Sequence, residues 1–246
     1  MINSKRAPGN NARYRMEMGT GKVSKGPIEA GLSTREVKRF YDRFGARQDR
    51  QGFYENAAER DLVRHSNFRE ARSVLEFGCG TGRFAEELLA RHLPSESRYV
   101  GIDISTTMVN LAEARLKPWR EHIRIIRTTG AVDLDFPAES FDRFVSCYVL
   151  DILPGEGIVR ILDEARRLLV SGGLICLISL TEGKTLLSRF VTGLWKRVYL
   201  VKPSLLGGCR PVILTEYLDP ESWRVTHHRV VTAWGISSEV VVAEKT

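Results

Sequence analysis

The 246-residue sequence has no long apolar run, few cysteines and no internal repeat. No uninterrupted apolar stretch approaches the roughly 20 residues that span a bilayer, and the first residues lack the short apolar core of a secretory signal. The four cysteines, at positions 79, 147, 176 and 209, are too scattered for a zinc motif or a disulfide framework. We therefore expect a soluble, cytoplasmic protein with reduced thiols and without a metal site.

Basic residues exceed acidic ones and give a formal net charge of +7. Residues 1–32 hold six basic and two acidic residues, so this segment supplies +4 of the excess. The segment is polar, rich in glycine and without hydrophobic periodicity, which predicts a disordered basic tail. RNA and anionic membranes attract such tails, but the near balance of charge elsewhere does not indicate a surface for nucleic acid.

A glycine-rich loop between an apolar segment and a helix-forming segment is the most informative feature. Residues 74–77 are mostly apolar, and Gly78, Gly80 and Gly82 follow at alternate positions. Glycine lets the backbone turn tightly against a ligand, and the amides of the following helix point back at that ligand. The spacing departs from the dinucleotide fingerprint, because Arg83 stands where the third small residue belongs.

With Glu76 in front, this loop resembles motif I of the class I S-adenosylmethionine-dependent methyltransferases, whose pattern is acid-x-Gly-x-Gly-x-Gly. Three later segments are similar to the family's in the same order: 99–105, 140–146 and 165–174. The first is an apolar run that ends near Asp103, the second begins Ser-Phe-Asp, and the third joins a helix, a glycine turn and a strand. The resemblance implies S-adenosylmethionine as cofactor and methyl transfer as activity.

Apolar strands alternate with amphipathic helices from residue 72 onward, which predicts a parallel sheet with its ligand beyond the carboxyl ends of the strands. We expect strands near 73–77, 98–102, 122–127, 143–149 and 174–180, and helices near 82–92, 106–117 and 156–169. Residues 225–231 and 238–243 should form a hairpin. The expected fold is α/β, a Rossmann-like three-layer sandwich with a mostly parallel seven-stranded sheet, an antiparallel last strand and an N-terminal helical extension.

Residues 33–70 are expected to form a helical lid. Ser33 and Glu36 have the spacing of a capping box, and a second helix should cover about 54–65. The segment that begins at Tyr41 resembles the Tyr-Asp lid of quinone-type methyltransferases, which makes Tyr41, Arg47 and Gln48 candidate lid residues. The remaining residues, 71–246, would form the cofactor-binding domain.

An insertion at 183–218 interrupts that domain. Its first half has the spacing of an amphipathic basic helix. This helix would either pack against the sheet edge or the N-terminal helices, or cap the acceptor pocket and touch a lipophilic substrate or a membrane surface.

The resemblance also implies roles for single residues. Asp103 would hold the ribose hydroxyls, and Glu76 would hold the methionine ammonium or only brace the loop. Ile104 and Met108 lie where the family packs the adenine, although ordinary core packing explains them equally well. The expected cofactor-binding residues are Tyr41, Glu76, Gly78, Cys79, Gly80, Gly82, Asp103, Ile104, Met108, Gly130 and Ala131.

The segment after the third strand departs from the family pattern. Counting back from Leu134 puts Gly130 where the family has an aspartate that meets the adenine. Backbone groups of Gly130 and Ala131 would then contact the adenine, or Asp133 would do so after a shift of register.

Tyr148 and Asp151 follow the fourth strand and are the candidate catalytic residues, expected at the rim where methyl group and acceptor meet. Asp151 would orient or deprotonate the acceptor, or else serve as a helix cap or surface acid.

The predicted function is methyl transfer from S-adenosylmethionine to a small hydrophobic or amphipathic acceptor. One alternative is an RNA methyltransferase, although residues 147–150 have neither the Asn/Asp-Pro-Pro-aromatic nor the Pro-Cys signature of such enzymes. The other is a non-catalytic partner subunit that binds the cofactor.

Overall fold

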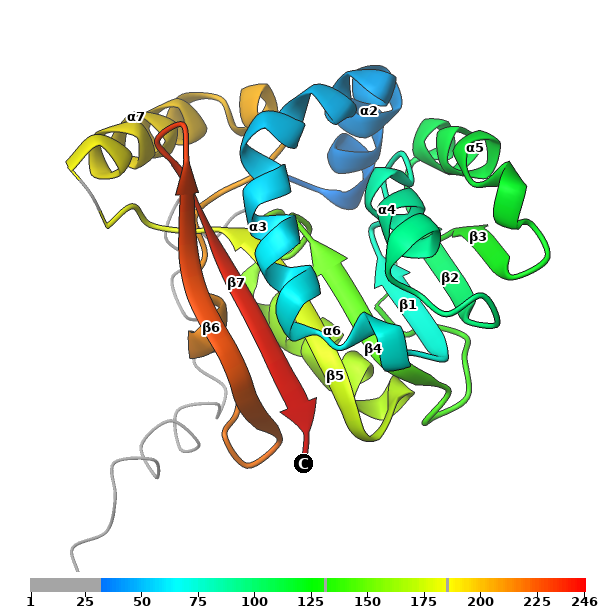
Figure 1. Ribbon diagram of the computed structural model, residues 1–246. Coiled ribbons are helices and arrows are strands. Elements are labelled where there is room, and N and C mark those ends of the chain that lie inside the picture. The colour runs from blue at the N-terminus through cyan, green and yellow to red at the C-terminus, as the bar shows by residue number, and fades with distance from the viewer. Residues whose placement is uncertain (1–31, 131, 185) are drawn as a thin grey trace, which may run out of the picture.

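A seven-stranded sheet forms the centre of the computed structural model, which describes residues 32–130, 132–184 and 186–246 (Figure 1). The strand order is β3-β2-β1-β4-β5-β7-β6. The first five strands are parallel, and β7 runs antiparallel to both of its neighbours. The strands are β1 (Ser73–Phe77), β2 (Arg98–Asp103), β3 (Ile123–Arg127), β4 (Phe141–Cys147), β5 (Leu169–Leu180), β6 (Trp223–Ala233) and β7 (Ile236–Lys245).

Several strand boundaries differ from the prediction by one or more residues, and two of these differences have a clear cause. β4 ends at Cys147 rather than at 149, because Tyr148 has a φ of 57° and leaves the extended conformation. β5 begins five residues before 174, since Leu169 already pairs with Phe141 across a shift of register.

Helices cover both faces of the sheet. On one face, α3 (Gly52–His65) and α4 (Arg83–Arg91) pack Leu62 and Leu88 against a buried layer that includes Val145. On the other face, α6 (Gly155–Leu168) packs Ile161 into the layer that contains Phe144. The remaining elements of this region are α5 (Thr106–Arg115), η2 (Phe68–Glu70) and η3 (Lys117–Trp119). The predicted Rossmann-like sandwich with its antiparallel last strand is confirmed.

The segment 33–70 is helical. α2 (Thr34–Phe44) begins with the capping box, in which the Ser33 amide donates to Glu36 Oε2 at 2.9 Å and the Glu36 amide donates back to Ser33 Oγ at 3.4 Å. The short turn η1 (Gly45–Gln51) joins α2 to α3. Of the predicted basic tail, residues 1–31 lie outside the described residues.

The insertion contains α7 (Leu186–Val201), η4 (Pro203–Leu206) and η5 (Leu214–Glu216). α7 and α2 lie at the end of the molecule where the parallel strands have their carboxyl ends (Figure 1). The indole Nε1 of Trp195 donates to the carbonyl oxygen of Cys209 at 2.9 Å, which fastens α7 to the loop that follows η4. Among the described residues, no helix combines the length and apolar character needed to cross a membrane.

Candidate active site

The glycine loop follows β1 directly and is tied to β2. The amides of Gly78 and Cys79 both donate to the carbonyl of Ile102, at 2.8 and 3.0 Å. Gly78 has a φ of 80°, and a Cβ added there would lie 2.3 Å from Val149 Cγ2. Only glycine meets both conditions, so the local sequence fixes how closely the loop approaches the end of β4.

Asp103 ends β2 beside this loop, and its carboxylate has two backbone partners. The Gly80 amide donates to Oδ2 at 3.0 Å and the Ser105 amide donates to Oδ1 at 2.8 Å. Burial raises the pKa of Asp103, while these hydrogen bonds from Ser105 and Gly80 oppose that rise. The side chain is thereby held at the cavity with lone pairs left to accept further hydrogen bonds.

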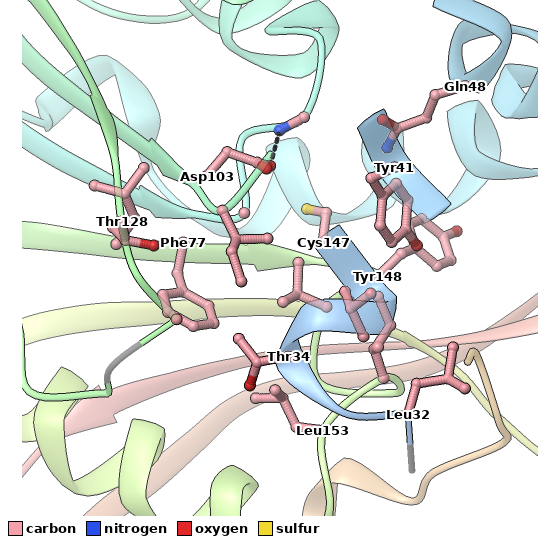
Figure 2. A pocket seen from close by; sticks show the side chains of 18 of the residues that line it. Leu32, Thr34, Tyr41, Gln48, Phe77, Asp103, Thr128, Cys147, Tyr148 and Leu153 are labelled. Carbon is pink, nitrogen blue, oxygen red and sulfur yellow. Dashed lines mark hydrogen bonds between the residues drawn. The ribbon is translucent and has the colours of Figure 1, made fainter. Parts of the chain in front are cut away.

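A cavity of about 140 Å³ lies beyond the carboxyl ends of β1, β2 and β4 (Figure 2). Residues of the lid form one wall of the cavity. The glycine loop and the ends of β1, β2 and β4 form the opposite wall, and the residues just before α6 close the cavity. The lining residues include Leu32, Thr34, Val37, Tyr41, Gln48, Phe77, Gly78, Gly80, Asp103, Ile104, Thr128, Gly130, Cys147, Tyr148, Val149, Ile152, Leu153 and Pro154.

Gln48 supplies an unpaired polar atom to this cavity. Its Oε1 is buried and, among the described residues, has no hydrogen-bond partner. A Cβ added at Gly80 would lie 3.0 Å from both amide heteroatoms of Gln48. A buried acceptor without a partner is unfavourable, so the site is suited to a ligand that donates a hydrogen bond at this point.

Tyr41 lines the cavity from α2, and its hydroxyl lies 3.8 Å from Cys209 Sγ. Burial, with smaller contributions from Cys209 and Asp151, raises the pKa of Tyr41 well above its ordinary value. The hydroxyl is therefore neutral at physiological pH. Arg47, the third lid residue suggested by the sequence, lies elsewhere, because its guanidinium caps the end of α2 by donating to the carbonyls of Arg43 and Phe44.

Tyr148 contributes its ring to the cavity, but its hydroxyl is engaged elsewhere. The hydroxyl shares a hydrogen bond of 2.9 Å with Ser238 Oγ on β7, and the ring packs edge-on against Tyr54. Burial raises the pKa of Tyr148 well above its ordinary value. The geometry thus suits Tyr148 to shaping the wall rather than to accepting a proton.

The structure corrects the expected place of Asp151. The side chain is fully buried and does not line the cavity, because the turn after β4 bends inward and leaves Val149 and Ile152 at the wall. Its Oδ2 accepts from the Leu180 amide at 3.3 Å, and burial raises its pKa to about 7. Asp151 is therefore absent from the cavity wall, and its Oδ1 is buried with no hydrogen-bond partner among the described residues.

Of the two roles left open for Met108, the structure shows core packing, since the side chain is fully buried on α5 and does not line the cavity. Glu76 and Cys79 line a smaller cavity of about 40 Å³ that shares Gln48, Gly78, Cys147 and Tyr148 with the main one. Glu76 accepts a hydrogen bond from the Tyr99 hydroxyl, and burial raises its pKa to about 8. Ala131 lies outside the described residues.

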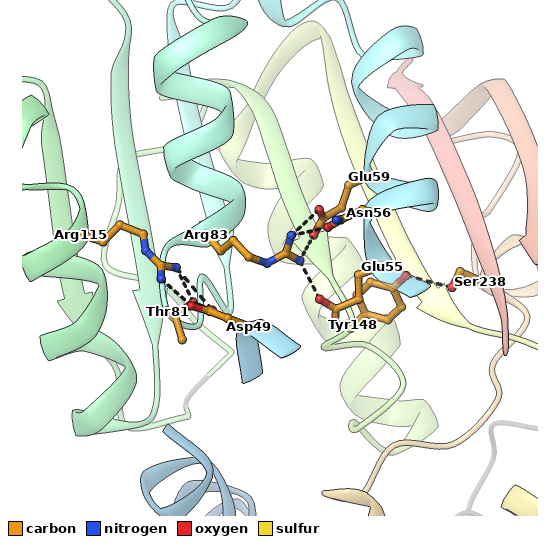
Figure 3. Close-up of polar contacts among 9 residues, drawn as sticks. All are labelled: Asp49, Glu55, Asn56, Glu59, Thr81, Arg83, Arg115, Tyr148 and Ser238. Atoms are coloured by element: carbon orange, nitrogen blue, oxygen red, sulfur yellow. Dashed lines mark hydrogen bonds and ion pairs between the residues drawn. The ribbon is translucent and has the colours of Figure 1, made fainter. Parts of the chain in front are cut away.

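Two arginines that the sequence reasoning missed connect the lid to the glycine loop (Figure 3). Arg83, which begins α4, bonds Glu55 and Glu59 of α3, each at 2.7 Å. Arg115 of α5 bonds Asp49 at 2.5 Å, and Asp49 also accepts from the Thr81 hydroxyl at 2.6 Å. These ion pairs hold the lid against the glycine loop, and no local sequence pattern predicts them.

A separate cluster joins α3 to β6. His65 and His227 stack with ring centroids 3.6 Å apart, and His227 Nε2 lies 2.7 Å from Asp61 Oδ2. The three residues have the spacing of a possible metal site. However, Arg229 donates to the other oxygen of Asp61 at 3.1 Å, so the carboxylate already has a cationic partner. The cluster is explained as a contact between two elements.

The comparisons with known proteins agree with this geometry. Residues 74–173 match a family described as a methyltransferase domain. The chain is 30% identical over 147 residues to the phosphatidylethanolamine N-methyltransferase of Cereibacter sphaeroides. The aligned region covers 58% of this chain and 67% of that protein. It is 28% identical over 119 residues to the demethylmenaquinone methyltransferase of Geobacillus stearothermophilus, which covers 48% of this chain and half of that relative.

Among solved structures, the N-methyltransferase NodS from Bradyrhizobium japonicum in complex with S-adenosyl-L-homocysteine superposes with a TM-score of 0.64. The superposition covers 85% of this chain and 98% of NodS at 20% sequence identity, so it supports the fold. The glycine loop, the carboxylate at the end of β2 and the sequence relatives point to one assignment. The chain belongs to the class I methyltransferases that use S-adenosylmethionine.

Proposed function

We propose that the protein transfers the methyl group of S-adenosylmethionine to a small hydrophobic or amphipathic acceptor. The observation that carries this proposal is the composition of the cavity wall. Of the described residues that line the cavity, Asp103 alone has a charged side chain, and apolar residues surround the ends of the strands. Sites of this kind bind small molecules through apolar contact and a few placed polar groups.

The residues present fit the cofactor. Asp103 would accept hydrogen bonds from the ribose hydroxyls, and the unpaired Gln48 Oε1 would accept one from the methionine ammonium or another donor. When bound, S-adenosylmethionine supplies an electrophilic methyl group on a positively charged sulfur. Gly78 and Gly80 leave the space that this fit needs, because a Cβ at either position would meet a neighbouring side chain.

We propose that the first residues of the lid move outward to admit the ligand. The cavity of about 140 Å³ is smaller than the roughly 300–1,000 Å³ usual for small-molecule sites. Thr34 lies close over Gly130, where an added Cβ would come within 2.4 Å of Thr34 Cγ2. In the proposed mechanism the segment that carries Leu32 and Thr34 moves outward as the ligand enters and then closes again to exclude water.

The chain contributes alignment rather than proton transfer. The hydroxyls of Tyr41 and Tyr148 have pKa values raised by burial, and Asp151 does not reach the cavity, so none of the three serves as a base there. The acceptor would arrive with its own nucleophilic lone pair or anion. Holding such an acceptor in line with the methyl group supplies about 7–11 kcal/mol of barrier reduction.

The relatives narrow the acceptor class. One is named for methylating phosphatidylethanolamine and another for demethylmenaquinone, both of which are lipophilic molecules with a polar reactive end. A methyl-transfer screen with radiolabelled cofactor would present phospholipids, quinone precursors, soluble amines and RNA. Turnover of a lipophilic acceptor supports the proposal. Turnover of RNA alone would establish the competing activity, and cofactor binding without turnover of any class would favour a non-catalytic subunit.

A further inference from the structure

An exposed apolar surface lies on α7, outside the cavity. The apolar side chains of Leu187, Phe190, Leu194 and Val201 are between 55% and 86% exposed. Their spacing of three, four and seven residues places them along one face. The opposite side of the helix packs against the rest of the protein, for instance through the buried Tyr199.

The hairpin between β6 and β7 extends this surface. Trp234 stands at its tip and is 80% exposed. A Cβ added at the neighbouring Gly235 would lie 3.1 Å from Val191 Cγ2, so the tip touches α7. Leu205 of η4 adds another exposed apolar side chain, at 62%. We call these residues the α7 surface: Leu187, Phe190, Leu194, Val201, Leu205 and Trp234.

The backbone at the tip gives a second, independent indication. Trp234 has a φ of 54°, and Gly235 follows with a φ of 80°. Such turns favour asparagine, aspartate or glycine at the first position, and a bulky aromatic residue is strained there. A strained residue persists where the surroundings or a function require it. Since the Trp234 ring is mostly exposed, packing within the protein does not account for it.

Basic residues outnumber acidic ones along α7 and the residues that flank it in the sequence. α7 contains no acidic residue, and its exposed basic side chains include Arg189 and Arg197. Lys184 precedes the helix and Lys202 follows it, both exposed. The nearest acid along the chain, Glu182, is already paired with Lys196. A basic helix with an apolar face and a neighbouring tryptophan is suited to the boundary between anionic lipid headgroups and acyl chains.

The α7 surface is linked to the cavity. Trp195 of α7 donates to the carbonyl of Cys209, whose sulfur contacts the Tyr41 hydroxyl at the cavity wall. Gly207 packs against the Phe40 ring of α2, where an added Cβ would lie 2.7 Å from Cε1. α7, the hairpin tip and α2 all lie at the same end of the molecule (Figure 1). A membrane against α7 would therefore face the lid.

We infer that the α7 surface docks on anionic membranes, with α7 lying flat in the interface and Trp234 inserted beside it. The docked lid would let a lipophilic acceptor pass between the bilayer and the cavity without crossing water. That consequence rests on the proposed function, whereas the docking itself does not.

Vesicle flotation of the full chain tests the inference without cofactor or acceptor. We expect the protein to float with vesicles of equimolar phosphatidylcholine and phosphatidylglycerol, more weakly at high salt, and to stay behind with pure phosphatidylcholine. The Phe190→Glu variant should lose affinity by at least about tenfold. Val225→Glu is the matched control, because it adds the same charge at an exposed apolar residue of β6 near the opposite end of the sheet. The control should bind like the wild type.

Tryptophan fluorescence provides a second readout. Anionic vesicles should shift the emission of the wild type to shorter wavelength, and Trp234→Phe should remove most of that shift. The basic residues of 1–32 are present in every variant, so a loss in Phe190→Glu is attributable to α7.

Three results would overturn the inference: no flotation of the wild type with anionic vesicles, equal flotation of Phe190→Glu and wild type, or a dimer in sedimentation velocity that Phe190→Glu dissociates while vesicles bind neither protein. The last would identify a second copy of the chain as the occupant. None of these results bears on whether the protein binds S-adenosylmethionine. Failure of the membrane-docking inference is therefore distinguishable from failure of the proposed function.

Discussion

The amide of Gln48 lies directly against Gly80, so that an added carbon at Gly80 would push the lid side chain back. A Cβ at Gly80 would stand 3.0 Å from both Nε2 and Oε1 of Gln48. The contact places a buried oxygen that has no hydrogen-bond partner among the described residues beside the loop that would hold the cofactor. We therefore make separate predictions for Gly80 and for Gln48.

Gly80→Ala should weaken binding of S-adenosylmethionine by at least about tenfold. Alanine is strained at a φ of 52°, and its methyl group would displace the Gln48 amide. Isothermal titration calorimetry measures the effect. Gly193→Ala is the matched control, because a Cβ there meets nothing within 4 Å. The control should keep full affinity and gain up to about 1 kcal/mol of stability from the better helix former. Equal affinities in the two variants would contradict the role assigned to the loop.

Gln48→Leu should separate stability from affinity. Removing a buried acceptor that has no partner relieves a penalty of about 1–3 kcal/mol, so the unliganded variant should be at least as stable as the wild type in urea denaturation. Its affinity for the cofactor should nevertheless fall, because the ligand can no longer donate a hydrogen bond to the Gln48 Oε1 atom. A variant that is destabilised and binds the cofactor normally would show that Gln48 serves the fold alone.

Asp151→Asn should flatten the dependence of stability on pH. The pKa of Asp151 is about 7 in the folded protein against an ordinary 3.8, so the folded state holds a proton that the unfolded state has released. Stability due to this group is complete below pH 3.8 and is lost as the pH rises to about 7. Between pH 5 and pH 8 the wild type should lose about 3 kcal/mol more than the variant. Parallel curves from urea midpoints would rule this out.

Arg83→Met should destabilise the fold by about 3–5 kcal/mol, since it leaves the buried carboxylates of Glu55 and Glu59 without their cation. Burial and the Glu59 charge already raise the pKa of Glu55 to about 7, and the loss of Arg83 should raise it further. The defect should therefore grow as the pH increases. Adding Glu55→Gln and Glu59→Gln should restore much of the stability. No rescue in thermal denaturation would mean that Arg83 acts through packing instead.

Local patterns were enough to predict most of the fold. The alternation of strands and helices, the alternate glycines after β1 and the Ser33–Glu36 capping box each depend on residues close together in the sequence, and the structure confirms them. The position of Asp103 is equally local, because it ends β2 and accepts a hydrogen bond from the Gly80 amide of the loop.

The features that the sequence did not reveal depend on contacts between distant segments. Asp151 lies beneath the cavity wall and not at the cavity rim, because the turn after β4 bends inward. This turn begins at Tyr148, whose φ is 57°. The partners of Arg83 stand 24 and 28 residues before it, on another helix. Met108 has the apolar character of an adenine contact, but the rotation of α5 turns it into the core.

Calorimetric titration of the protein with S-adenosyl-L-homocysteine, beside the Asp103→Ala variant, tests the central claim most directly. We expect saturable binding of one ligand per chain to the wild type, with affinity reduced at least tenfold in the variant while the melting temperatures stay comparable. A wild type that binds neither S-adenosyl-L-homocysteine nor S-adenosylmethionine, or a variant that binds as tightly as the wild type, would contradict it.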